Sequence, residues 1–438
     1  MNTSPVQASA PLRVALLGCG TVGSHVARLL TSRADQLETM IGRPIELAGI
    51  AVKSLDEVPD SLPEALFTDD AAALVARGDL DIVIELIGGV DFAGQMVRSA
   101  IEHGASVVTA NKALLGAHGA ELFAQAEAAG VDLYFEAAVA GAIPIIRPLR
   151  ESLIGDEITL VMGIVNGTTN YILEKMTVDQ LDFAEALAQA QRLGFAEADP
   201  TADVEGYDAA SKAAILASLA FRTWVGADQV GREGITDVTQ EDIQAADRAG
   251  CVLKLLATAQ ILTDGAVSVR VHPAMVPKDH PLATVGGPYN AIFLQAREAD
   301  RLMFLGPGAG GAPTASAVVG DLATVARNRH RGVAGPAHAP TRLLPVAEPG
   351  AVVTRYHLRF VVADQPGILA SVAAAFAAHN VSVRTVHQSA PEADPEATAQ
   401  ISLMTHLATE ADVQACVADL DASPFLRGPV RLLRVEGM

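Results

Sequence analysis

Cysteine is rare in this sequence, and the few cysteines form no pattern. Cys19, Cys251 and Cys416 lie far apart in a chain of 438 residues. Their spacing matches no cysteine motif that binds a metal ion. The distribution argues against a cysteine metal site and fits a reducing compartment such as the cytoplasm.

Basic clusters and long hydrophobic runs are also missing. The chain holds 31 Lys and Arg against 51 Asp and Glu, a net charge of −20, and its basic residues form no run. Nucleic-acid binding needs clustered cations that face the phosphates. No apolar run reaches the roughly 18 residues of a membrane span, and residues 1–5 lack the features of a signal peptide. We therefore expect a cytoplasmic protein that binds small molecules, and neither nucleic acid nor membranes.

What the chain does have is enough length and apolar residues for several domains. Half of its residues are hydrophobic (50%), and 438 residues exceed the size of one compact core. The predicted boundaries are 11–136 for a first domain, closed by part of 306–328, then 137–328 for a second domain, 329–352 for a linker and 353–438 for a third domain.

Short strands alternate with Ala-rich helices in the first domain. The predicted strands are 12–17, 45–52, 81–87, 105–110 and 131–136. This alternation is typical of an α/β fold with a doubly wound, Rossmann-like parallel sheet.

The second domain has a mixed, α+β pattern. Residues 158–165 predict a strand, and 178–193 predict a helix that begins with a capping box of Thr177 and Gln180. The remaining elements are predicted as helices at 206–223 and 241–262, and as strands of a mixed sheet at 267–276, 290–297 and 301–305.

The third domain follows a segment rich in Pro, Gly, His and Arg. Asp364 is expected to cap its first helix, with Pro366 at the first helical position. Its order is predicted as βαββαβ, with strands at 355–362, 381–388, 399–407 and 429–435 and the second helix at 409–420. We predict a small domain that can be separated from the rest.

The first strand runs into a glycine motif that opens a helix. Such a loop lets the main chain approach a pyrophosphate, and the helix N-terminus favours its negative charge. We predict dinucleotide binding by Gly18, Gly20, Thr21, Val22 and Gly23. After the second strand an Asp or Glu would hold the 2′-hydroxyl of NAD, but this chain has Lys53, which favours the 2′-phosphate of NADP. The alternative is a solvent-facing lysine, with the ribose held by Asp56 or by the main chain.

Lys112 lies at the carboxyl end of the fourth strand, where open parallel sheets bind their ligands. It is predicted to neutralise a substrate carboxylate or to face the reacting carbonyl. The alternative is an exposed lysine at the start of a helix. Glu136 ends the fifth strand, and its carboxylate together with main-chain oxygens of residues 137–144 could ligate a hard cation, although a capped turn is the simpler explanation.

Two further turns precede helices. Residues 166–171 resemble a turn that cradles a substrate, although N-capping by Thr168 or Thr169 explains them almost as well. The glycine-rich segment 306–311 is predicted to pack against the cofactor, and a tight turn is the alternative.

An acidic segment, 194–206, runs directly into an apolar helix. Asp208 and Lys212 are the only charges between Glu205 and Arg222, and their i,i+4 spacing places them on one helix face. An exposed pair of this kind contributes only a few tenths of a kcal/mol, whereas burying two ions among Ala, Ile and Leu costs several kcal/mol each. We therefore expect this pair to have a function, namely proton transfer.

These motifs together resemble those of the homoserine dehydrogenases of the aspartate pathway, in their longer form with a C-terminal ACT domain. The resemblance covers nearly the whole chain, from Leu12 to Glu436, and it is most specific in 166–173 and 194–212. It implies that the first domain binds the nucleotide, that the second is the catalytic and dimerisation domain, and that the third is an ACT domain.

The resemblance also implies roles for single residues. Lys212 would be the proton donor and acceptor at the substrate oxygen, with Asp208 as its partner and a substrate contact. Glu197 would hold the substrate ammonium group, supported by Asp203. The remaining implied positions are Gly167 and Thr168 at the substrate, Lys112 beside the nicotinamide, Gly310 at the cofactor, and Glu136, Val139, Gly141 and Ile143 around a sodium-like ion.

The implied reaction is reversible hydride transfer between NAD(P)H and L-aspartate 4-semialdehyde, which gives L-homoserine in threonine, methionine and isoleucine biosynthesis. A homodimer or homotetramer is implied, and the ACT domain implies feedback inhibition by L-threonine. A purely structural dimerisation module is the alternative for that domain. For the whole chain, the alternatives are another NAD(P)-dependent amino-acid or hydroxy-acid dehydrogenase, or a ligand sensor without activity.

Overall fold

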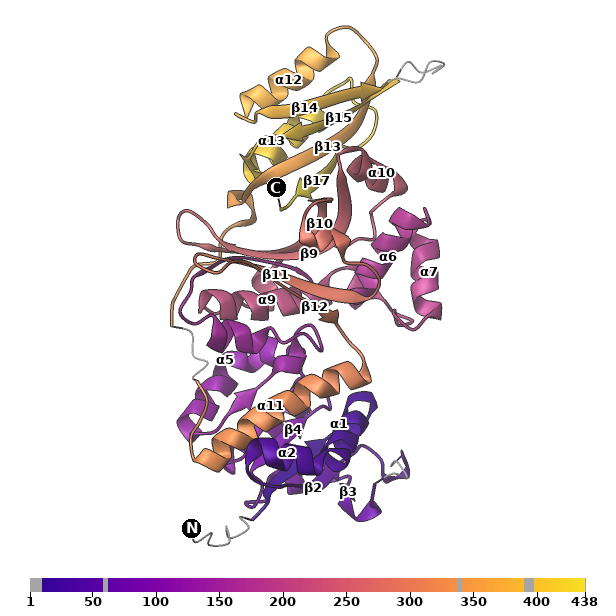
Figure 1. Cartoon of the computed structure of the whole chain (residues 1–438). Coiled ribbons are helices and arrows are strands. Elements are labelled where there is room, and N and C mark those ends of the chain that lie inside the picture. The colour runs from indigo at the N-terminus through magenta and orange to yellow at the C-terminus, as the bar shows by residue number, and fades with distance from the viewer. Residues whose placement is uncertain (1–9, 58–61, 337–340, 390–397, 438) are drawn as a thin grey trace. The chain divides into compact units, whose positions relative to one another are not determined.

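The computed structural model describes residues 10–57, 62–336, 341–389 and 398–437 (Figure 1). The chain groups into two compact units. The first unit comprises Met1–Val161, Ser211–Asp228 and Tyr289–Leu343, and the second comprises Met162–Ala210, Gln229–Pro288 and Leu344–Met438. Helix α9 (Tyr207–Phe221) begins in the second unit and continues in the first. Residues 337–340 of the predicted linker lie outside the described residues.

The first unit contains a six-stranded parallel sheet in the order β3-β2-β1-β4-β5-β6. The strands are β1 (Leu12–Leu17), β2 (Ile45–Ala51), β3 (Phe67–Thr68), β4 (Ile82–Glu85), β5 (Ser106–Thr109) and β6 (Leu133–Tyr134). The chain winds to one side of β1 and then to the other, so the carboxyl ends of β1 and β4 flank a switch point, where such sheets bind ligands. The doubly wound sheet is confirmed.

Helices pack against this sheet because each contributes an apolar face. Val318, Leu322 and Val325 of α11 share one core with Val14 and Leu16 of β1, and α11 lies beside α1 and α2 (Figure 1). The helices of the unit are α1 (Thr21–Ser32), α2 (Ala34–Ile41), α3 (Ala71–Val75), α4 (Asp91–Glu102), α5 (Lys112–Ala129) and α11 (Gly311–Arg331). An antiparallel hairpin of β11 (Tyr289–Ala296) and β12 (Asp300–Pro307) also belongs to it.

The second unit contains a mixed sheet in the order β7-β9-β10-β17-β13-β15-β14, with β8 beside β10 and β16 beside β13. The strands are β7 (Ile158–Ile164, shared by both units), β8 (Gly231–Arg232), β9 (Cys251–Ile261), β10 (Val267–Pro277), β13 (Val353–Ala363), β14 (Val383–Ser389), β15 (Thr398–Thr405), β16 (Ala408–Thr409) and β17 (Arg431–Val435). The predicted mixed sheet is confirmed.

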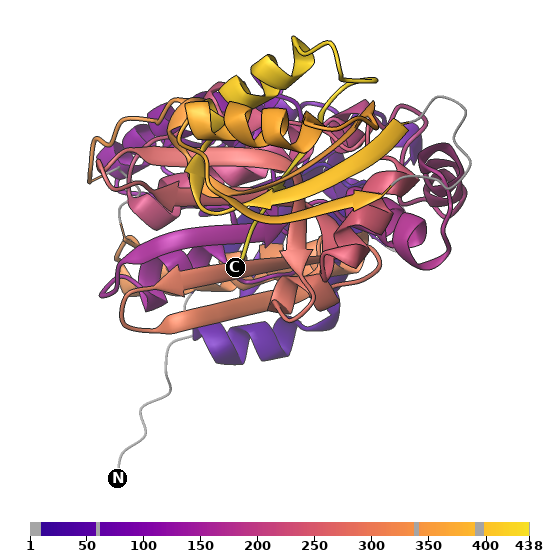
Figure 2. The same ribbon diagram turned by 90° about the horizontal axis from the view of Figure 1, so that it is seen from above.

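Among the described residues, the second unit also contains the helices α6 (Gly167–Val178), α7 (Phe183–Arg192), α8 (Thr201–Val204), α10 (Gln240–Arg248), α12 (Ile368–Ala378) and α13 (Glu410–Asp421), besides the start of α9. Helices α12 and α13 lie on one face of β13, β15 and β14 (Figure 2). Their shared core includes Tyr356, Phe360, Phe376 and Leu420, and the predicted βαββαβ order is confirmed. Shorter helical turns lie at Leu55–Glu57, Glu64–Leu66, Glu136–Ala138, Pro148–Ser152, Ala227–Gln229, Pro281–Thr284 and Pro349–Ala351.

The predicted helix at 241–262 is wrong in its second half. Helix α10 ends at Arg248, Gly250 turns the chain with a φ of 71°, and Cys251 begins strand β9. Most of β9 is buried on both faces. Such a strand shows no alternation of apolar and polar residues, so its sequence matches a buried helix equally well.

Two predicted helix starts are also wrong. Helix α6 runs to Val178, and α7 begins after Asp182, whose side chain accepts a hydrogen bond from the Glu185 amide at 2.8 Å. The Thr177 hydroxyl instead donates to the Leu173 carbonyl inside α6. In the last segment, α12 begins after Gly367, so neither Asp364 nor Pro366 starts it. Asp182 is the side-chain cap of α7, whereas Gly367 precedes α12 without any side-chain cap hydrogen bond.

The segment 353–438 lies in the same compact unit as residues 229–288, and the prediction that it can be separated from the rest stays a prediction. Strand β17 pairs with β10, which belongs to 229–288 of the same unit. Arg270 of β10 forms buried ion pairs with Glu410 (3.4 Å) and Glu436 (3.2 Å). The order βαββαβ gives no indication of which edge strand pairs with a neighbour, so the sequence did not reveal this junction.

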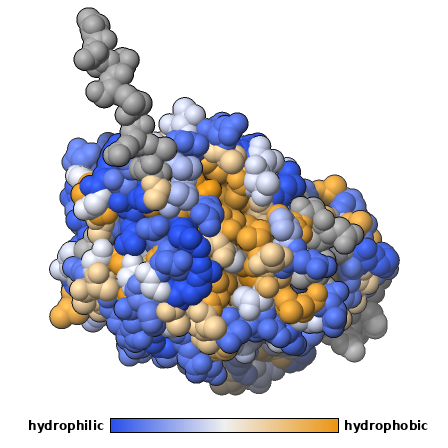
Figure 3. All heavy atoms as spheres, turned by 90° about the horizontal axis from the view of Figure 1, so that it is seen from below, coloured by the Kyte–Doolittle hydropathy of each residue, from blue (hydrophilic) through white to orange (hydrophobic). Residues whose placement is uncertain are grey.

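The face seen from below carries both polar and apolar side chains (Figure 3). Seen from below, hydrophobic side chains lie between hydrophilic ones (Figure 3). Met40, Leu55 and Phe92 are among the large apolar side chains that the first unit exposes. Scattered exposure of this kind is ordinary on folded proteins. In the described part of the chain, no helix combines the length and the hydrophobicity needed to cross a bilayer.

Candidate functional site

The loop between β1 and α1 has the geometry of a dinucleotide-binding turn. Gly18 has a φ of 96°, and a Cβ there would lie 2.7 Å from the Leu86 carbonyl oxygen. A Cβ at Gly23 would lie 2.0 Å from the Gly18 carbonyl oxygen, whereas one at Gly20 would meet no atom within 4 Å. Thr21 and Val22 form the first turn of α1. The helix N-terminus therefore has space in front of it at Gly20, as a pyrophosphate requires.

Gly310 lies close to this loop. It precedes α11, and a Cβ at the next residue, Gly311, would lie 2.9 Å from the Thr21 carbonyl oxygen. The starts of α11 and α1 are therefore in close contact, which places Gly310 beside the glycine motif.

Lys53 lies at the same edge of the parallel sheet. The Gly18 amide donates to the Ala51 carbonyl at 2.8 Å, and Lys53 follows two residues later with an exposed side chain. Ser54 and Asp56 hydrogen-bond to each other at 3.2 Å. The position suits a contact to the ribose end of a dinucleotide.

A buried hydrogen-bond network fixes the neighbouring loop, and the sequence reasoning missed it. The Glu85 carboxylate, at the end of β4, accepts from the amides of Ile87 (2.9 Å) and Gly88 (3.0 Å) and from the Thr109 hydroxyl (2.5 Å). Asn111 caps α5 and donates to the Gly89 carbonyl at 2.7 Å. The acidic residue ending a buried strand was the available signal for this network.

Lys112 is the first residue of α5 and is half-buried. Because Asn111 is tied to Gly89, the start of α5 and the loop after β4 are held together at the carboxyl edge of the sheet. The structure thus places Lys112 in the region where the sequence predicted it.

Helix α9 carries Asp208 and Lys212 one turn apart, and both are half-buried. Asn166 connects Asp208 to a second carboxylate: its Nδ2 donates to Asp208 Oδ2 at 2.9 Å and to Asp203 Oδ1 at 2.6 Å. Two predicted substrate residues are therefore brought together. The sequence placed Asn166 in the turn but did not predict that it bridges them.

The turn at the start of α6 is closely packed. A Cβ at Gly167 would lie 2.5 Å from the Pro288 carbonyl oxygen, and the Thr168 hydroxyl donates to the Phe195 carbonyl at 2.6 Å. Asn166, and not Thr168 or Thr169, caps α6 by accepting from the Thr169 amide at 2.9 Å. The alternative explanation of the two threonines as caps is therefore wrong.

Glu197 has an exposed side chain in the segment before α8. Its main-chain oxygen accepts from Gln191 Nε2 at 3.0 Å. The hydrogen bonds that join Asn166, Asp203 and Asp208 do not include Glu197.

Lys254 of β9 was not predicted from the sequence. It is buried, and its ammonium group donates to Asn170 Oδ1 at 2.9 Å and to the Val285 carbonyl at 2.6 Å. Burial lowers the pKa of Lys254 to about 8. Asn170 donates in turn to the Gly287 carbonyl at 2.8 Å, so this network fixes α6 to the segment against which Gly167 packs. A single lysine within an apolar strand was the only sequence signal.

Glu136 is buried and caps a turn. Its carboxylate accepts from the amides of Ile145 (2.6 Å), Ile146 (2.7 Å) and Arg147 (3.0 Å), as the simpler explanation of the sequence expected. Burial raises the pKa of this carboxyl group. Its amide donates to Asp321 at 2.6 Å, and Asp321 also pairs with Arg147 at 2.8 Å.

These contacts bear on the predicted cation site at Glu136, Val139, Gly141 and Ile143. The donors would be a carboxylate and main-chain oxygens, which suit a hard cation. Glu136 Oε1 already accepts two amides and Oε2 accepts one, so Oε2 has the remaining capacity. Among the described residues, no group of three or more His, Cys, Asp or Glu side chains could hold a metal ion. The cation site stays a prediction.

Comparison with known proteins agrees with this geometry. Residues 18–136 match the family described as the NAD binding domain of homoserine dehydrogenase, 144–323 match homoserine dehydrogenase, and 356–424 match the ACT domain. The chain is 51% identical over 427 residues to the homoserine dehydrogenase of Corynebacterium glutamicum, covering 97% of this chain and 95% of that protein. It is 52% identical over 433 residues to that of Mycobacterium tuberculosis, covering 98% of both.

Solved structures give the same result. A homoserine dehydrogenase from Thiobacillus denitrificans matches with a TM-score of 0.91 and 39% identity over 98% of both chains. A hyperthermophilic archaeal homoserine dehydrogenase in complex with NADPH matches with a TM-score of 0.62 and 27% identity, over 72% of this chain and 98% of that one. With its NAD-binding, catalytic and ACT segments, the chain belongs to the homoserine dehydrogenase family of oxidoreductases.

Proposed function

We propose that this protein reduces L-aspartate 4-semialdehyde reversibly to L-homoserine with NAD(P)H. The observation that supports this most directly is the joining of Asp208, Asn166 and Asp203 by hydrogen bonds, with Lys212 one turn further along α9. Two carboxylates and an amine so arranged match a substrate that carries both an ammonium group and a reacting carbonyl.

The bound nicotinamide supplies the hydride, and the chain's own residues handle the charge and the proton. Lys212 is proposed to donate a proton to the aldehyde oxygen as negative charge develops there, and to accept it in the reverse direction. Asp208 is its proposed partner and a substrate contact.

Binding of the substrate is assigned to further predicted residues. Glu197 and Asp203 are proposed to hold the ammonium group of the substrate. Lys112 is proposed either to bind the substrate carboxylate or to lie beside the nicotinamide. Gly167 and Thr168 shape the turn, which close packing against Pro288 and Phe195 keeps rigid.

We propose that the enzyme prefers NADP to NAD, because Lys53 follows β2 and its positive charge suits the 2′-phosphate of NADP. Gly18, Gly20, Thr21, Val22, Gly23 and Gly310 would contact it through the main chain. A sodium-like cation at Glu136, Val139, Gly141 and Ile143 would act only on the structure of that turn.

The proposal extends to the oligomeric state, the regulation, the cellular location and the pathway of the enzyme. We propose a cytoplasmic homodimer or homotetramer in threonine, methionine and isoleucine biosynthesis, inhibited by L-threonine through the segment that matches the ACT domain. Initial rates with and without threonine test the regulation, and analytical ultracentrifugation tests the assembly.

A substrate comparison tests the reaction. Oxidation of NADPH and of NADH is followed by spectrophotometry, once with aspartate 4-semialdehyde and once with succinic semialdehyde, which lacks the ammonium group. We expect turnover with aspartate 4-semialdehyde. With succinic semialdehyde, kcat/KM should be lower by a factor of about 10² or more, because Glu197 and Asp203 then have no ammonium group to bind. Equal kcat/KM values for the two aldehydes would contradict recognition of the ammonium group. Cofactor binding without turnover would favour the alternative of a ligand sensor without activity.

A further inference from the structure

The proposed reaction assigns no role to the buried ammonium group of Lys254. This residue lies in β9, and its exposed fraction is 5%. Taking a charged group out of water costs several kcal/mol, and an apolar side chain of similar volume often gives equal or greater stability. Packing alone therefore does not account for a lysine at this position.

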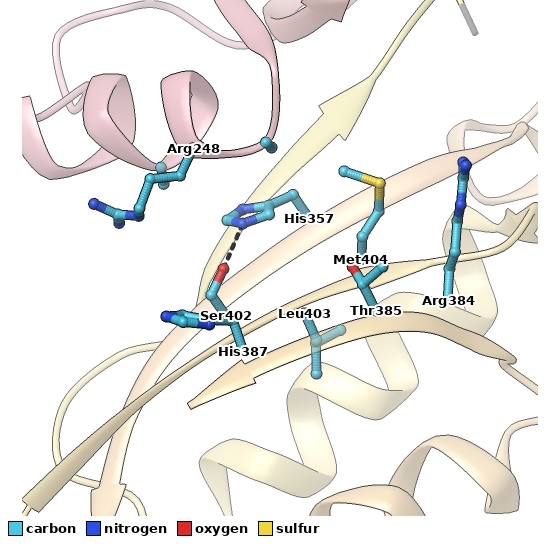
Figure 4. Close-up of a pocket in the computed structure, with 10 residues that line it drawn as sticks. Arg248, His357, Arg384, Thr385, His387, Ser402, Leu403 and Met404 are labelled. Carbon is cyan, nitrogen blue, oxygen red and sulfur yellow. Dashed lines mark hydrogen bonds between the residues drawn. The ribbon is translucent and has the colours of Figure 1, made fainter. Parts of the chain in front are cut away.

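Lys254 is also not placed to bind a ligand in the open cleft of the second unit. That cleft has a volume of about 550 Å³ and is lined by residues of α10, β13, β14 and β15, among them Arg248, His357 and Met404 (Figure 4). Its described lining includes neither Lys254 nor any residue of α6. A role for Lys254 would therefore act through the residues that it contacts.

Lys254 joins helix α6 to the segment 285–288. Its Nζ donates to Asn170 Oδ1 of α6 at 2.9 Å and to the Val285 carbonyl at 2.6 Å. Asn170 Nδ2 donates to the Val285 carbonyl at 3.2 Å and to the Gly287 carbonyl at 2.8 Å. The segment is thus held by donors from both β9 and α6.

Two further contacts hold the same segment against α6. The Glu174 carboxylate, also on α6, accepts from the Gly287 amide at 2.6 Å. At the start of the helix, a Cβ at Gly167 would lie 2.5 Å from the Pro288 carbonyl oxygen. The two main chains are therefore in direct contact at Gly167, and movement of the segment displaces the start of α6.

The start of α6 in turn holds the residues proposed for the substrate ammonium group. Asn166 Nδ2 donates to Asp203 Oδ1 at 2.6 Å. The Thr168 hydroxyl donates to the carbonyl of Phe195, which lies two residues before Glu197, at 2.6 Å. The positions of both carboxylates therefore depend on where α6 begins.

We propose that Lys254 is a positioning residue for substrate recognition, which keeps α6, and with it Asp203 and Glu197, where the substrate ammonium group binds. The inference rests on the proposed function, because it takes these two carboxylates as the partners of the ammonium group. Lys254 acts through Asn170 and the segment 285–288 and does not touch the substrate. Its loss should therefore affect recognition of the ammonium group more than hydride transfer.

The ratio of kcat/KM for aspartate 4-semialdehyde to kcat/KM for succinic semialdehyde measures this recognition. Both values are measured with NADPH in the full-length chain. In Lys254→Met the ratio should fall about tenfold, because Asn170 loses a donor and α6 is less firmly placed. A loss of stability alone would lower kcat/KM for both aldehydes equally and leave the ratio unchanged.

Two further variants separate positioning from a general defect, and circular dichroism checks the fold of each variant. Glu174→Ala frees the Gly287 amide without touching the buried charge, so the ratio should fall in the same direction. Thr258→Val changes another buried polar residue of β9 whose side chain, among the described residues, makes no hydrogen bond to α6. It should leave the ratio unchanged.

An unchanged ratio in folded Lys254→Met and in Glu174→Ala would overturn the inference and leave the proposed function standing. An equal fall in Thr258→Val would do the same. If Lys254→Met does not fold, Glu174→Ala alone decides. A wild type that turns over neither aldehyde, or both equally, would overturn the proposed function and this inference with it.

Discussion

At the scale of single residues, Lys254 shows what burial does to a charge. Its ammonium group is held by one amide oxygen and one main-chain oxygen, and its pKa falls from 10.5 to about 8. The folded chain therefore releases this proton more readily than the unfolded chain does.

That difference predicts a pH dependence of stability. Between about pH 8 and pH 10.5, Lys254 binds more protons in the unfolded state than in the folded state. The contribution of Lys254 to the free energy of unfolding therefore rises with pH over this range, and it is lost as pH falls toward 8. The full change is roughly 3 kcal/mol. Urea unfolding at a series of pH values should show this rise in the wild type and lose it in Lys254→Met.

Lys278 provides the matched control for this prediction. It is an exposed lysine paired with Asp247 at 2.6 Å. Lys278→Met should keep the pH dependence of the wild type, and a similar loss in both variants would argue against burial as the cause.

Lys53 carries the prediction on cofactor choice. Lys53→Asp should raise the KM for NADPH about tenfold and that for NADH much less, because a carboxylate repels a 2′-phosphate and accepts a 2′-hydroxyl. Steady-state kinetics with both cofactors measure this. Arg331→Asp, an exposed charge at the end of α11, is the control, and equal effects of Lys53→Asp on both cofactors would defeat the assignment.

At the scale of elements, α6 joins stability to the proposed site through its cap. Asn166 caps the helix and bridges Asp203 and Asp208. Asn166→Ala should lower the free energy of unfolding by about 1 kcal/mol and kcat/KM by about 10², since it removes the cap and the bridge together.

The next helix separates these two effects. Asp182 caps α7 in the same way but contacts neither carboxylate. Asp182→Ala should therefore lower the free energy of unfolding by a similar amount, about 1 kcal/mol, with kcat/KM unchanged. Equal losses of kcat/KM in the two variants would show that the loss follows stability and not the bridge.

Elements also show what a sequence can predict and why it stops there. Alternating strands and helices, and the glycine motif between β1 and α1, depend on local patterns, and both were predicted correctly. Strand β9 was predicted as a helix because burial on both faces removes its alternation. Asn166 and Lys254 were missed because their partners are more than 30 residues away, and no local pattern records such contacts.

At the scale of the whole molecule, the segment that matches the ACT domain shares its sheet and its buried charges with the rest of the second unit. Arg270 of β10 pairs with Glu410 and Glu436, and Arg359 of β13 pairs with Asp242 of α10. Burial and the charge of Arg270 hold the pKa of His272 well below its ordinary value. Each of these three ion pairs has one partner in residues 353–438 and the other outside that segment.

A chain truncated after residue 352 should therefore be less stable than the full-length chain and lose part of its folded structure. It would expose the paired edge of β10 and leave Arg270 without its two carboxylates, which costs several kcal/mol. Circular dichroism and gel filtration of the truncated chain measure the result. A folded, active truncated enzyme would show that this junction contributes little, and threonine inhibition is better tested in the full-length chain.

The central claim is that Lys212 donates the proton at the substrate oxygen. The most direct measurement is kcat with aspartate 4-semialdehyde, together with the Kd for NADPH, in Lys212→Ala and in Lys175→Ala, which breaks another i,i+4 pair with a carboxylate on a helix. We predict that kcat falls by about 10² or more in Lys212→Ala alone, with the Kd for NADPH nearly unchanged. A kcat close to that of the wild type, or a loss confined to NADPH binding, would contradict the account.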